Sequence, residues 1–510
     1  MVPHRAVPRK TAAVPVRARL SDRYSGSLGW AEWQDCVIDI DGQHLTSDQI
    51  AAAAEGPLNV KVTHDALEAV RRSHAEAVRA ARQRPIYGLT TGVGANRLID
   101  VEPDTEGAQA LLRSHATSAG PPRSDARVRA MLLIRLNQLC AGGAGLRPVI
   151  VEALERMVNT DTLPTIREFV GIGTAELSAL ATTALALQAR SLLSEHPELV
   201  FGPHDALPFI SSNAAALADA ALAARCFDTT ARAALIVAAL SFAAVRGNSE
   251  AYAPPVERAT PMPGARTTCR VMRYLVGSPE PARIQDPYGL RALPQGHGIL
   301  LDALSTLRST IEAYANAPSE NPSILADGSV AHHGGFHAGY LALTCDTAAI
   351  AAVQSGQLAL NRLTYVSEPN HTGLEPFLGD GTPGASGVMV VEYVAATALG
   401  DLRAAAAPAS TQSITLSRGI EDTASFASLA ARQLFTASDR YQLLVACELV
   451  AALRAVRMSA PVLTGPQQQA VAACAELSAV LDDRDLTGDL EVAQRLLPSL
   501  AELVDDRVLG

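Results

Sequence analysis

Lysine is the residue that this sequence most clearly lacks, because Lys10 and Lys61 are the only two in a chain of 510 residues. Enzymes that use pyridoxal phosphate, or that form a Schiff base with a carbonyl substrate, need a lysine in the active site. Lys10 lies in a Pro- and Arg-rich N-terminal stretch, and Lys61 lies in a predicted helix–turn region near the start. The sequence therefore argues against pyridoxal phosphate, and it indicates no other cofactor.

Paired cysteines, long apolar runs and excess positive charge are also missing. The seven cysteines are scattered and form no C-x-x-C pair, which favours reduced thiols in a cytoplasmic protein over disulfides or a zinc site. No run of about 18 uncharged apolar residues occurs, so we expect no membrane span. The net charge of −10 argues against a nucleic-acid partner.

Alanine is abundant, within a hydrophobic fraction of 48%, and it is the best helix former. The pattern predicts a mainly α fold, with long helices over residues 300–316, 338–362, 395–406 and 425–458. Residues 254–286, which are rich in Pro and Gly, are predicted to be mostly loop. Residues 1–35, which are rich in Pro and Arg and have no apolar core segment, are predicted to be a disordered extension.

Residues 163–181, which read LPTIREFVGIGTAELSALA, carry the most informative local pattern. The glycine-containing turn Gly171-Ile172-Gly173 leads directly into an Ala-rich helix predicted over 178–193. Glycine permits φ > 0, and Thr174 or Glu176 suits the partial positive charge of a helix N-terminus. The pattern fits either a capped helix or a reaction centre. The flanking segments distinguish these two interpretations.

Two other segments add polar groups that suit such a centre. Ser211-Ser212-Asn213 opens a second Ala-rich helix, and two helix N-termini that converge can hold an anion. Residues 86–94 contain three glycines and form a loop with Tyr87 at its stem, from which a tyrosine can reach a covered site. His332-His333-Gly334-Gly335-Phe336-His337 matches no standard ligand spacing, so we expect no metal.

Several motifs, in the right order from about residue 37 to 460, resemble the histidine, phenylalanine and tyrosine ammonia-lyase and aminomutase family. The segments that carry the resemblance are Tyr87-Gly-Leu-Thr-Thr-Gly-Val-Gly94 (YGxxTGFG), Arg113-Ser114-His115-Ala116 (substrate selectivity), 139–147 (LxxGxSGxR), Gln285-Asp286-Pro287-Tyr288-Gly289-Leu290-Arg291 with Pro294-Gln295 (QDPYSLRCxPQ), Gly334-Gly335-Phe336-His337 (GGNFHG) and Glu421-Asp422 (QED).

The resemblance implies an almost wholly helical protein with a long central bundle. It also implies a homotetramer whose active sites combine residues of three subunits. On this basis we divide the chain into the extension, 1–35, an N-terminal domain with the tyrosine loop and the turn, 36–230, and a helical bundle with C-terminal helices, 231–510. In the family the electrophile is a methylidene-imidazolone (MIO), made from an internal Ala-Ser-Gly.

The sequence departs from the family at that centre. Without a gap, Gly173-Thr174-Ala175 occupies the Ala-Ser-Gly trio, and with one deletion only Thr174-Ala175 does, so the middle residue is never serine. Thr174 has a hydroxyl to lose, but its extra methyl group hinders addition, and Ala175 crowds ring closure. The asparagine turn that supports the MIO is here Ser211-Ser212-Asn213. We therefore expect no ordinary MIO.

The positions that match the family's site remain and define the candidate residues. For catalysis they are Tyr87, Glu421, Tyr288 and Glu176; for substrate binding they are Arg291, His115, Phe336, Ser211, Asn213, Thr174 and Gln285. An arginine can grip a carboxylate through two hydrogen bonds, and a tyrosine can transfer a proton. A histidine at 115, where the family contacts the substrate's ring, favours a polar ring.

Three functions fit these residues. The first is an MIO-independent enzyme that uses Tyr87 for elimination, isomerisation or cyclisation of an amino-acid-like carboxylate. The second is an aromatic amino acid ammonia-lyase or aminomutase with a Thr-derived prosthetic group, and the third is a non-catalytic binding relative. The first two predict a small amino-acid-like substrate.

Overall fold

The computed structural model describes residues 37–191, 199–325 and 327–504, so the predicted extension, 1–35, lies outside the described residues. Helices make up 61% of the structure, and the strands of the described residues form only three two-stranded sheets. The prediction of a mainly α protein is confirmed.

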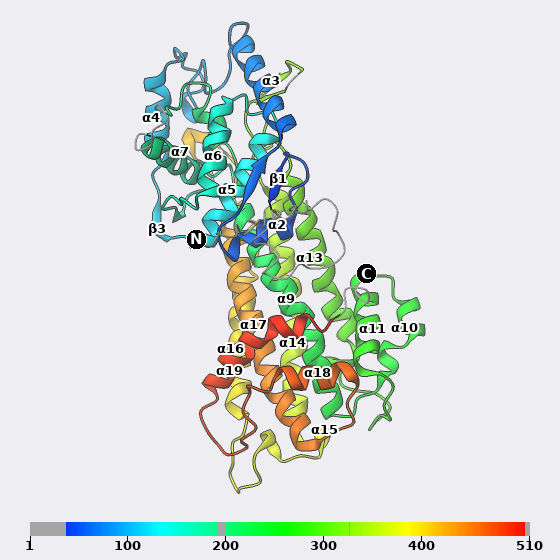
Figure 1. Ribbon diagram of the computed structural model, residues 1–510. Helices are drawn as coiled ribbons and strands as arrows, with labels where there is room; N and C mark the ends of the chain where they lie inside the picture. Colours follow the sequence, from blue (N-terminus) through cyan, green and yellow to red (C-terminus); the bar gives the residue numbers. More distant parts are fainter. Residues whose placement is uncertain (1–36, 192–198, 326, 505–510) are drawn as a thin grey trace, which may run out of the picture.

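Short helices and strands pack at one end of the molecule, at the top of Figure 1. Two parallel strands near the start, β1 and β2, pair Ile38 with Val60, and the antiparallel β3 and β4 pair further along the chain. The elements of this end are β1 (Ile38–Ile40), α2 (Ser47–Ala51), β2 (Val60–Val62), α3 (His64–Ala81), α4 (Thr105–His115), β3 (Ala119–Pro122), α5 (Asp125–Cys140), α6 (Pro148–Asn159), β4 (Arg167–Phe169), α7 (Leu177–Ser191) and α8 (Ala206–Ile210).

Long helices run side by side along the molecular axis and form its centre (Figure 1). They are α9 (Ala214–Ala244), α13 (Leu293–Ala315), α14 (Gly339–Ser367), α16 (Met389–Ala405) and α17 (Ala427–Ser459). Two short C-terminal helices, α18 (Gly465–Ala473) and α19 (Thr487–Ala501), pack against this bundle. The predicted domain boundary at residue 230 falls inside α9, which continues through it without a break.

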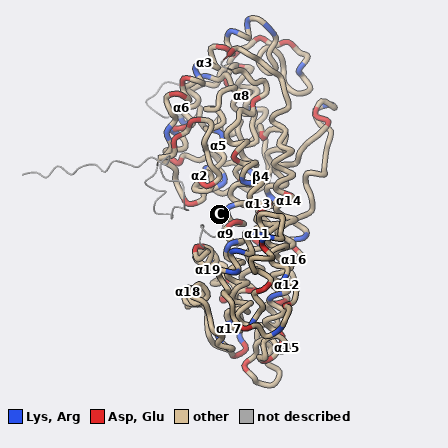
Figure 2. The backbone as a smooth tube through the Cα atoms, turned by 90° about the vertical axis from the view of Figure 1, so that its right-hand side faces the viewer, with Lys and Arg blue, Asp and Glu red and all other residues tan. Residues whose placement is uncertain are grey.

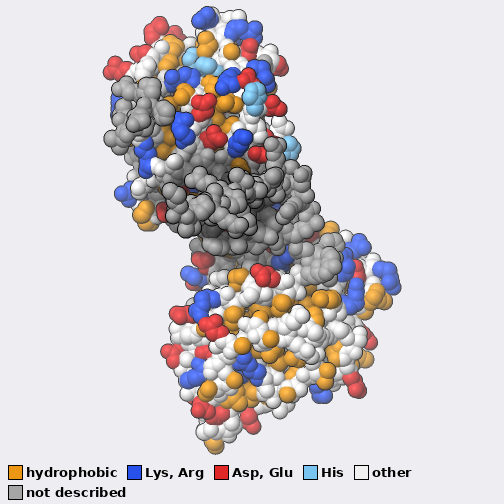
Figure 3. Space-filling model, viewed as in Figure 1, with side chains coloured by type: hydrophobic (Ala, Val, Ile, Leu, Met, Phe, Trp, Pro, Cys, Tyr) orange, Lys and Arg blue, Asp and Glu red, His pale blue; other side chains and the backbone are white. Residues whose placement is uncertain are grey.

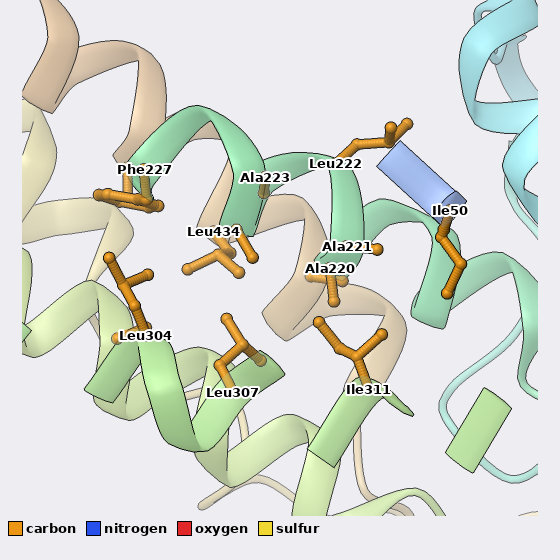
Figure 4. Packing of buried hydrophobic residues seen from close by; sticks show 14 of the residues in the cluster. Ile50, Ala220, Ala221, Leu222, Ala223, Phe227, Leu304, Leu307, Ile311 and Leu434 are labelled. Carbon is orange, nitrogen blue, oxygen red and sulfur yellow. The ribbon is translucent and has the colours of Figure 1, made fainter. Parts of the chain in front are cut away.

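The bundle is close-packed because α9 presents small side chains to its neighbours. Ala220, Ala221 and Ala223 on α9 lie near Leu307 and Ile311 of α13, as Figure 4 shows. All five side chains are buried within one hydrophobic cluster. Alanine on a central helix lets neighbouring backbones approach closely, and large side chains of the neighbours fill the remaining space.

One helical stretch, Ala206–Ala244, is long and apolar enough to cross a membrane by length and composition alone. Its most apolar window has a mean hydropathy of 1.4, but 78% of that window is buried inside the protein. A core helix of this kind passes the same test, so the finding is weak evidence for a membrane span. The stretch contains charged residues such as Asp219, so it is not an uncharged apolar run.

The prediction of loop over residues 254–286 is wrong for much of that segment. The structure has two helices there, α10 (Pro254–Ala259) and α11 (Pro263–Val276). Each begins with a proline in its first turn, where the missing N–H has no helical partner to lose. These prolines therefore start helices, although a Pro-rich segment predicts a loop.

Candidate active site

The turn at residues 171–176 joins β4 to α7 in a conformation that L-residues rarely adopt. Gly173 has a φ of +85° and Ala175 a φ of +67°. Such a φ costs glycine little, but it costs an alanine roughly 1–2 kcal/mol. Thr174, between them, forms an isolated β-bridge with His337. The surroundings therefore hold the turn in a strained shape, which is common at functional sites.

The start of α17 holds the carbonyl groups of this turn one after another. Ser428 Oγ donates to the Gly171 carbonyl, the Phe426 N–H donates to the Ile172 carbonyl, and Ser425 Oγ donates to the Gly173 carbonyl, each at 2.8 Å. The Gly173 oxygen also accepts the N–H of Ala338, at 3.3 Å. Two donors on one oxygen draw electron density away from the Gly173 carbonyl carbon.

Three long helices begin at the turn. Phe426 is the N-cap of α17 and Ala338 is the N-cap of α14, and both donate their N–H to carbonyls of the turn. The third helix, α9, contacts the turn through Glu176, whose carboxylate accepts the N–H of Ala216 at 2.7 Å. Each helix start carries about half a positive charge, so together they favour a carboxylate or a developing negative charge nearby.

Glu176 is a fully buried acid rather than an exposed group on the floor of the site. Its own N–H donates to the Ser212 carbonyl at 2.8 Å, and its Oε1 has no hydrogen-bond partner among the described residues. Burial raises the pKa of Glu176 to about 7, although Arg123 and the N–H of Ala216 favour the ionised form. A carboxyl group with this pKa exchanges its proton near neutral pH.

Tyr87 is half-buried and is fixed at both ends. Its phenolic oxygen accepts the N–H of Gly94 at 2.7 Å, and its own N–H donates to the imidazole Nε2 of His332 at 3.1 Å. The glycine loop therefore folds back on its own tyrosine. Burial is the largest cause that raises the pKa of Tyr87, and the carboxylate of Glu421 adds to it, while the Gly94 N–H and Arg97 oppose it.

Glu421 reaches the tyrosine loop from a tight hairpin. Leu416 and Glu421 pair across the hairpin, and the residues between them include Ser417 and Arg418, with φ of +50° and +58°. A Cβ added at Gly94 would lie 3.9 Å from Glu421 Oε1, which places this carboxylate at the edge of the loop. The structure thus brings Tyr87 and Glu421 near each other.

Phe336 lies beside the turn that opens α9. The side-chain amide of Asn213 donates to the Phe336 carbonyl, and Asn213 Oδ1 is buried without a partner. Ser211 Oγ accepts the N–H of Asn321 at 3.3 Å, so this serine fixes the chain that leads to Phe336. With His337 bridged to Thr174, these contacts place Ser211, Asn213, Phe336 and Thr174 in one region.

His115 ends α4 next to α7. Its Nδ1 lies 2.9 Å from the Leu111 carbonyl and 3.0 Å from Ser114 Oγ. In the tautomer whose Nδ1 proton is donated to the carbonyl, Nε2 is an acceptor. Ser178, in the first turn of α7, donates to the His115 carbonyl at 3.0 Å. The histidine is therefore tied to the helix that follows the turn.

Comparison with known proteins identifies the family and the fold. The family described as aromatic amino acid lyase matches residues 45–477. The chain belongs to the aromatic amino acid lyase family. It is 31% identical over 482 residues to a histidine ammonia-lyase of Streptomyces avermitilis, covering 88% of this chain and 94% of that protein. It is also 31% identical over 504 residues to a histidine ammonia-lyase of Geobacillus thermodenitrificans, covering 93% and 99%.

Solved structures of the family share the fold. A tyrosine aminomutase of Streptomyces globisporus superposes with a TM-score of 0.84 at 25% identity, over 92% of this chain and 98% of that chain. An ergothionase of Treponema denticola, solved with desmethyl-ergothioneine sulfonic acid, also gives a TM-score of 0.84, at 23% identity, over 92% and 100%. At that identity the second likeness shows the fold alone.

A second group of candidate residues lies elsewhere on the chain. Gln285 is exposed, and Tyr288 and Arg291 belong to the short helix α12 (Tyr288–Arg291). This helix packs against the C-terminal end of α14, whereas the turn contacts the start of α14. Figure 2 shows α12 toward α15 (Pro369–Thr372). The guanidinium of Arg291 lies 4.6 Å from the centre of the Tyr288 ring, and Tyr288 is 65% exposed. Within a single chain the structure does not bring this group to Thr174.

Three groups that hold the turn are not indicated by any motif in the sequence. They are Ser425, Ser428 and Ala338. They act on backbone carbonyls, and a donor to a carbonyl has no motif of its own. Ser425 lies four residues after Glu421 and just before a helix, which is the one local signal that could have indicated it. In the part of the chain that the structure describes, no group of three or more His, Cys, Asp or Glu side chains could hold a metal ion.

Proposed function

We propose that this protein catalyses an ammonia-lyase or aminomutase reaction on a small amino acid with a polar ring. The observation that carries the proposal is that Tyr87 and Glu421 lie near each other in the candidate site. The turn of that site contacts the N-termini of three long helices. Helix starts favour the substrate's carboxylate and the charge that develops when a proton leaves. Tyr87 transfers that proton, and Glu421 is the adjacent acid or base.

The electrophile, on this proposal, forms from Gly173-Thr174-Ala175. The nitrogen of Ala175 attacks the carbonyl carbon of Gly173, and the carbonyl oxygen leaves as one water. The Thr174 hydroxyl leaves with the Cα proton as a second water, which gives an ethylidene in place of the family's methylidene. The two donors on the Gly173 oxygen, Ser425 Oγ and the Ala338 N–H, support the first step because they polarise the bond under attack.

A second candidate is the same site acting without a covalent electrophile, on a substrate whose leaving group departs unaided. The specific observation that favours it is Ala175, whose Cβ adjoins the nitrogen that would attack. The curated relatives, which are histidine ammonia-lyases, support the first candidate more than this one.

The substrate class follows from His115. On this proposal Nδ1 donates to the Leu111 carbonyl, Nε2 offers a lone pair, and a ring that carries an N–H or O–H donor satisfies it. Histidine and tyrosine carry such donors and phenylalanine does not. A site built to pair with a donor rejects the analogue that lacks it more strongly than a plain apolar pocket would.

We also propose that the working enzyme is a homotetramer in the cytoplasm, in which a partner copy supplies the group of Gln285, Tyr288 and Arg291. Tyr288 is exposed and Arg291 is partly exposed beside its ring, so both side chains can contact another surface. Hydrophobic side chains also gather over the lower half of the face shown in Figure 3. Arg291 would then hold the substrate carboxylate by two hydrogen bonds.

The test combines a mass measurement with an assay. The purified protein is digested, the peptide that contains residues 171–176 is weighed, and ammonia release is measured with L-histidine, L-tyrosine and L-phenylalanine. A peptide two waters lighter than its sequence, with release from histidine or tyrosine, supports the first candidate. An unmodified peptide excludes it and leaves the second, whereas binding of the amino acids without any turnover indicates a non-catalytic relative.

A further inference from the structure

His332 lies directly against the backbone of the proposed proton-transfer residue. It follows β6 (Val330–Ala331), and its Nε2 lies 3.1 Å from the backbone nitrogen of Tyr87, 245 residues earlier in the chain. This contact and the bond from the Gly94 N–H to the Tyr87 oxygen hold the tyrosine at two points. The position of the phenol therefore depends on the imidazole.

The contact exists only while the imidazole is neutral. A backbone N–H can only donate, so Nε2 must present its lone pair. When a proton binds, both ring nitrogens become donors, and an N–H then faces the N–H of Tyr87. Protonation thus removes an acceptor and also places two donors against each other.

The surroundings of His332 favour the neutral ring at neutral pH. His332 is exposed, and partial desolvation is the largest cause that lowers its pKa, while the positive charges of Arg84 and His333 lower it further. Arg84 lies close because its guanidinium donates to the Val330 carbonyl at 3.3 Å. On Tyr87 itself the nearby charges are those of Glu421 and Arg97. Arg84 and His333 therefore disfavour a charged imidazole at His332. The carboxylate of Glu421 acts on the phenol of Tyr87 instead.

We propose that His332 is a positioning residue that seats Tyr87 while it is neutral and releases the tyrosine loop when it binds a proton. The inference rests on the proposed role of Tyr87 in proton transfer. Its consequence is an acidic limb in the activity profile that belongs to His332 and to no group that contacts the substrate. The glycines at 88, 92 and 94 let the stem of the loop change conformation once this contact is lost, while its hydrogen bonds from Gly92 to Ile99 and from Val101 to Thr90 remain.

Amide exchange of the full-length protein tests the seating without any need for turnover. Exchange of the peptide that contains Tyr87 is measured from pH 5 to pH 8 and corrected for the intrinsic rate. We expect protection to fall about fivefold toward acid pH in the wild type, as befits one hydrogen bond. His332→Gln, whose amide oxygen accepts at every pH, should show no fall, and His332→Lys should be unprotected throughout.

His64→Gln, which removes an exposed histidine at the start of α3, is the matched control and should behave as the wild type. Protection that is independent of pH in the wild type, or that falls equally in His332→Gln, overturns the proposal.

The pH profile of kcat/KM separates this proposal from the proposed function. With whichever of the three amino acids is converted, His332→Gln should lose the acidic limb that the wild type and His64→Gln retain. An unchanged limb in His332→Gln overturns the positioning role. If instead Tyr87→Phe is fully active while the exchange result holds, the proposed function fails and the seating of Tyr87 stands.

Discussion

Ser425 Oγ occupies the place that a side chain at Gly173 would need. A Cβ built on Gly173 would lie 2.1 Å from Ser425 Oγ and 2.6 Å from the Ala427 nitrogen, while the same hydroxyl donates to the Gly173 carbonyl at 2.8 Å. The glycine at the first position of the proposed trio is therefore matched to the start of α17. The start of α17 packs against residue 173 so closely that only a residue without a side chain fits there.

Gly173→Ala should destabilise the protein by about 2–5 kcal/mol. Overpacking against a backbone nitrogen costs roughly 1–3 kcal/mol, and a φ of +85° costs an alanine roughly 1–2 kcal/mol more. Urea unfolding measures the change. Gly334→Ala is the control, because nothing lies within 4 Å of its added Cβ and its φ is not positive. Equal stability of the two variants would contradict this account of the turn.

Thr174→Ser combined with Ala175→Gly should raise the fraction of modified peptide. The turn already has positive φ at 173 and 175, and glycine at 175 removes the methyl group beside the attacking nitrogen. Serine in place of threonine leaves an unhindered methylidene after water is lost. The expected result is a peptide lighter by two waters with new near-ultraviolet absorbance.

Thr174→Ala with Ala175→Gly is the control for this variant, since it has no hydroxyl to lose and can release only one water. If the serine variant stays unmodified, the turn lacks the geometry for cyclisation, and the candidate without an electrophile gains.

The sequence predicts the mainly α fold, because its helix content follows from alanine. For the site, the motifs name Tyr87 and Glu421 as candidates, but they do not indicate the contacts that hold the turn. The helix over Pro263–Val276 was missed because proline at a helix start has the same local appearance as proline in a loop. The buried position of Glu176 could not be predicted, because its partner, the Ala216 N–H, lies 40 residues further along the chain.

Glu176→Gln should stabilise the protein at alkaline pH and leave it unchanged in acid. The folded-state pKa of Glu176 is raised from 4.5 to about 7, so its ionised form is disfavoured by folding. The stability of the wild type is therefore full below pH 4.5 and is lost as pH rises to about 7, by about 3 kcal/mol. Glutamine keeps an acceptor for the Ala216 N–H and never ionises.

The measurement is the free energy of unfolding of both proteins at pH 4, 6 and 8. Glu68→Gln, at an exposed ion pair with Arg71 on α3, serves as the control and should show little change at any pH. A constant difference between Glu176→Gln and the wild type at all three pH values would mean that Glu176 does not titrate in this range.

Tyr87→Phe should lower kcat by about 10²–10⁴-fold, the range that a positioned acid or base contributes. The substitution removes only the oxygen that accepts the Gly94 N–H, so the loop keeps its contact with His332.

Because burial and Glu421 raise the pKa of Tyr87, the phenol stays protonated at neutral pH in the free enzyme. If Tyr87 acts as the base, kcat/KM of the wild type should therefore rise toward alkaline pH, and Glu421→Gln should move that rise to lower pH by removing a negative charge from beside the phenol. A rise that does not shift in Glu421→Gln would assign the titration to another group, even if Tyr87→Phe is inactive.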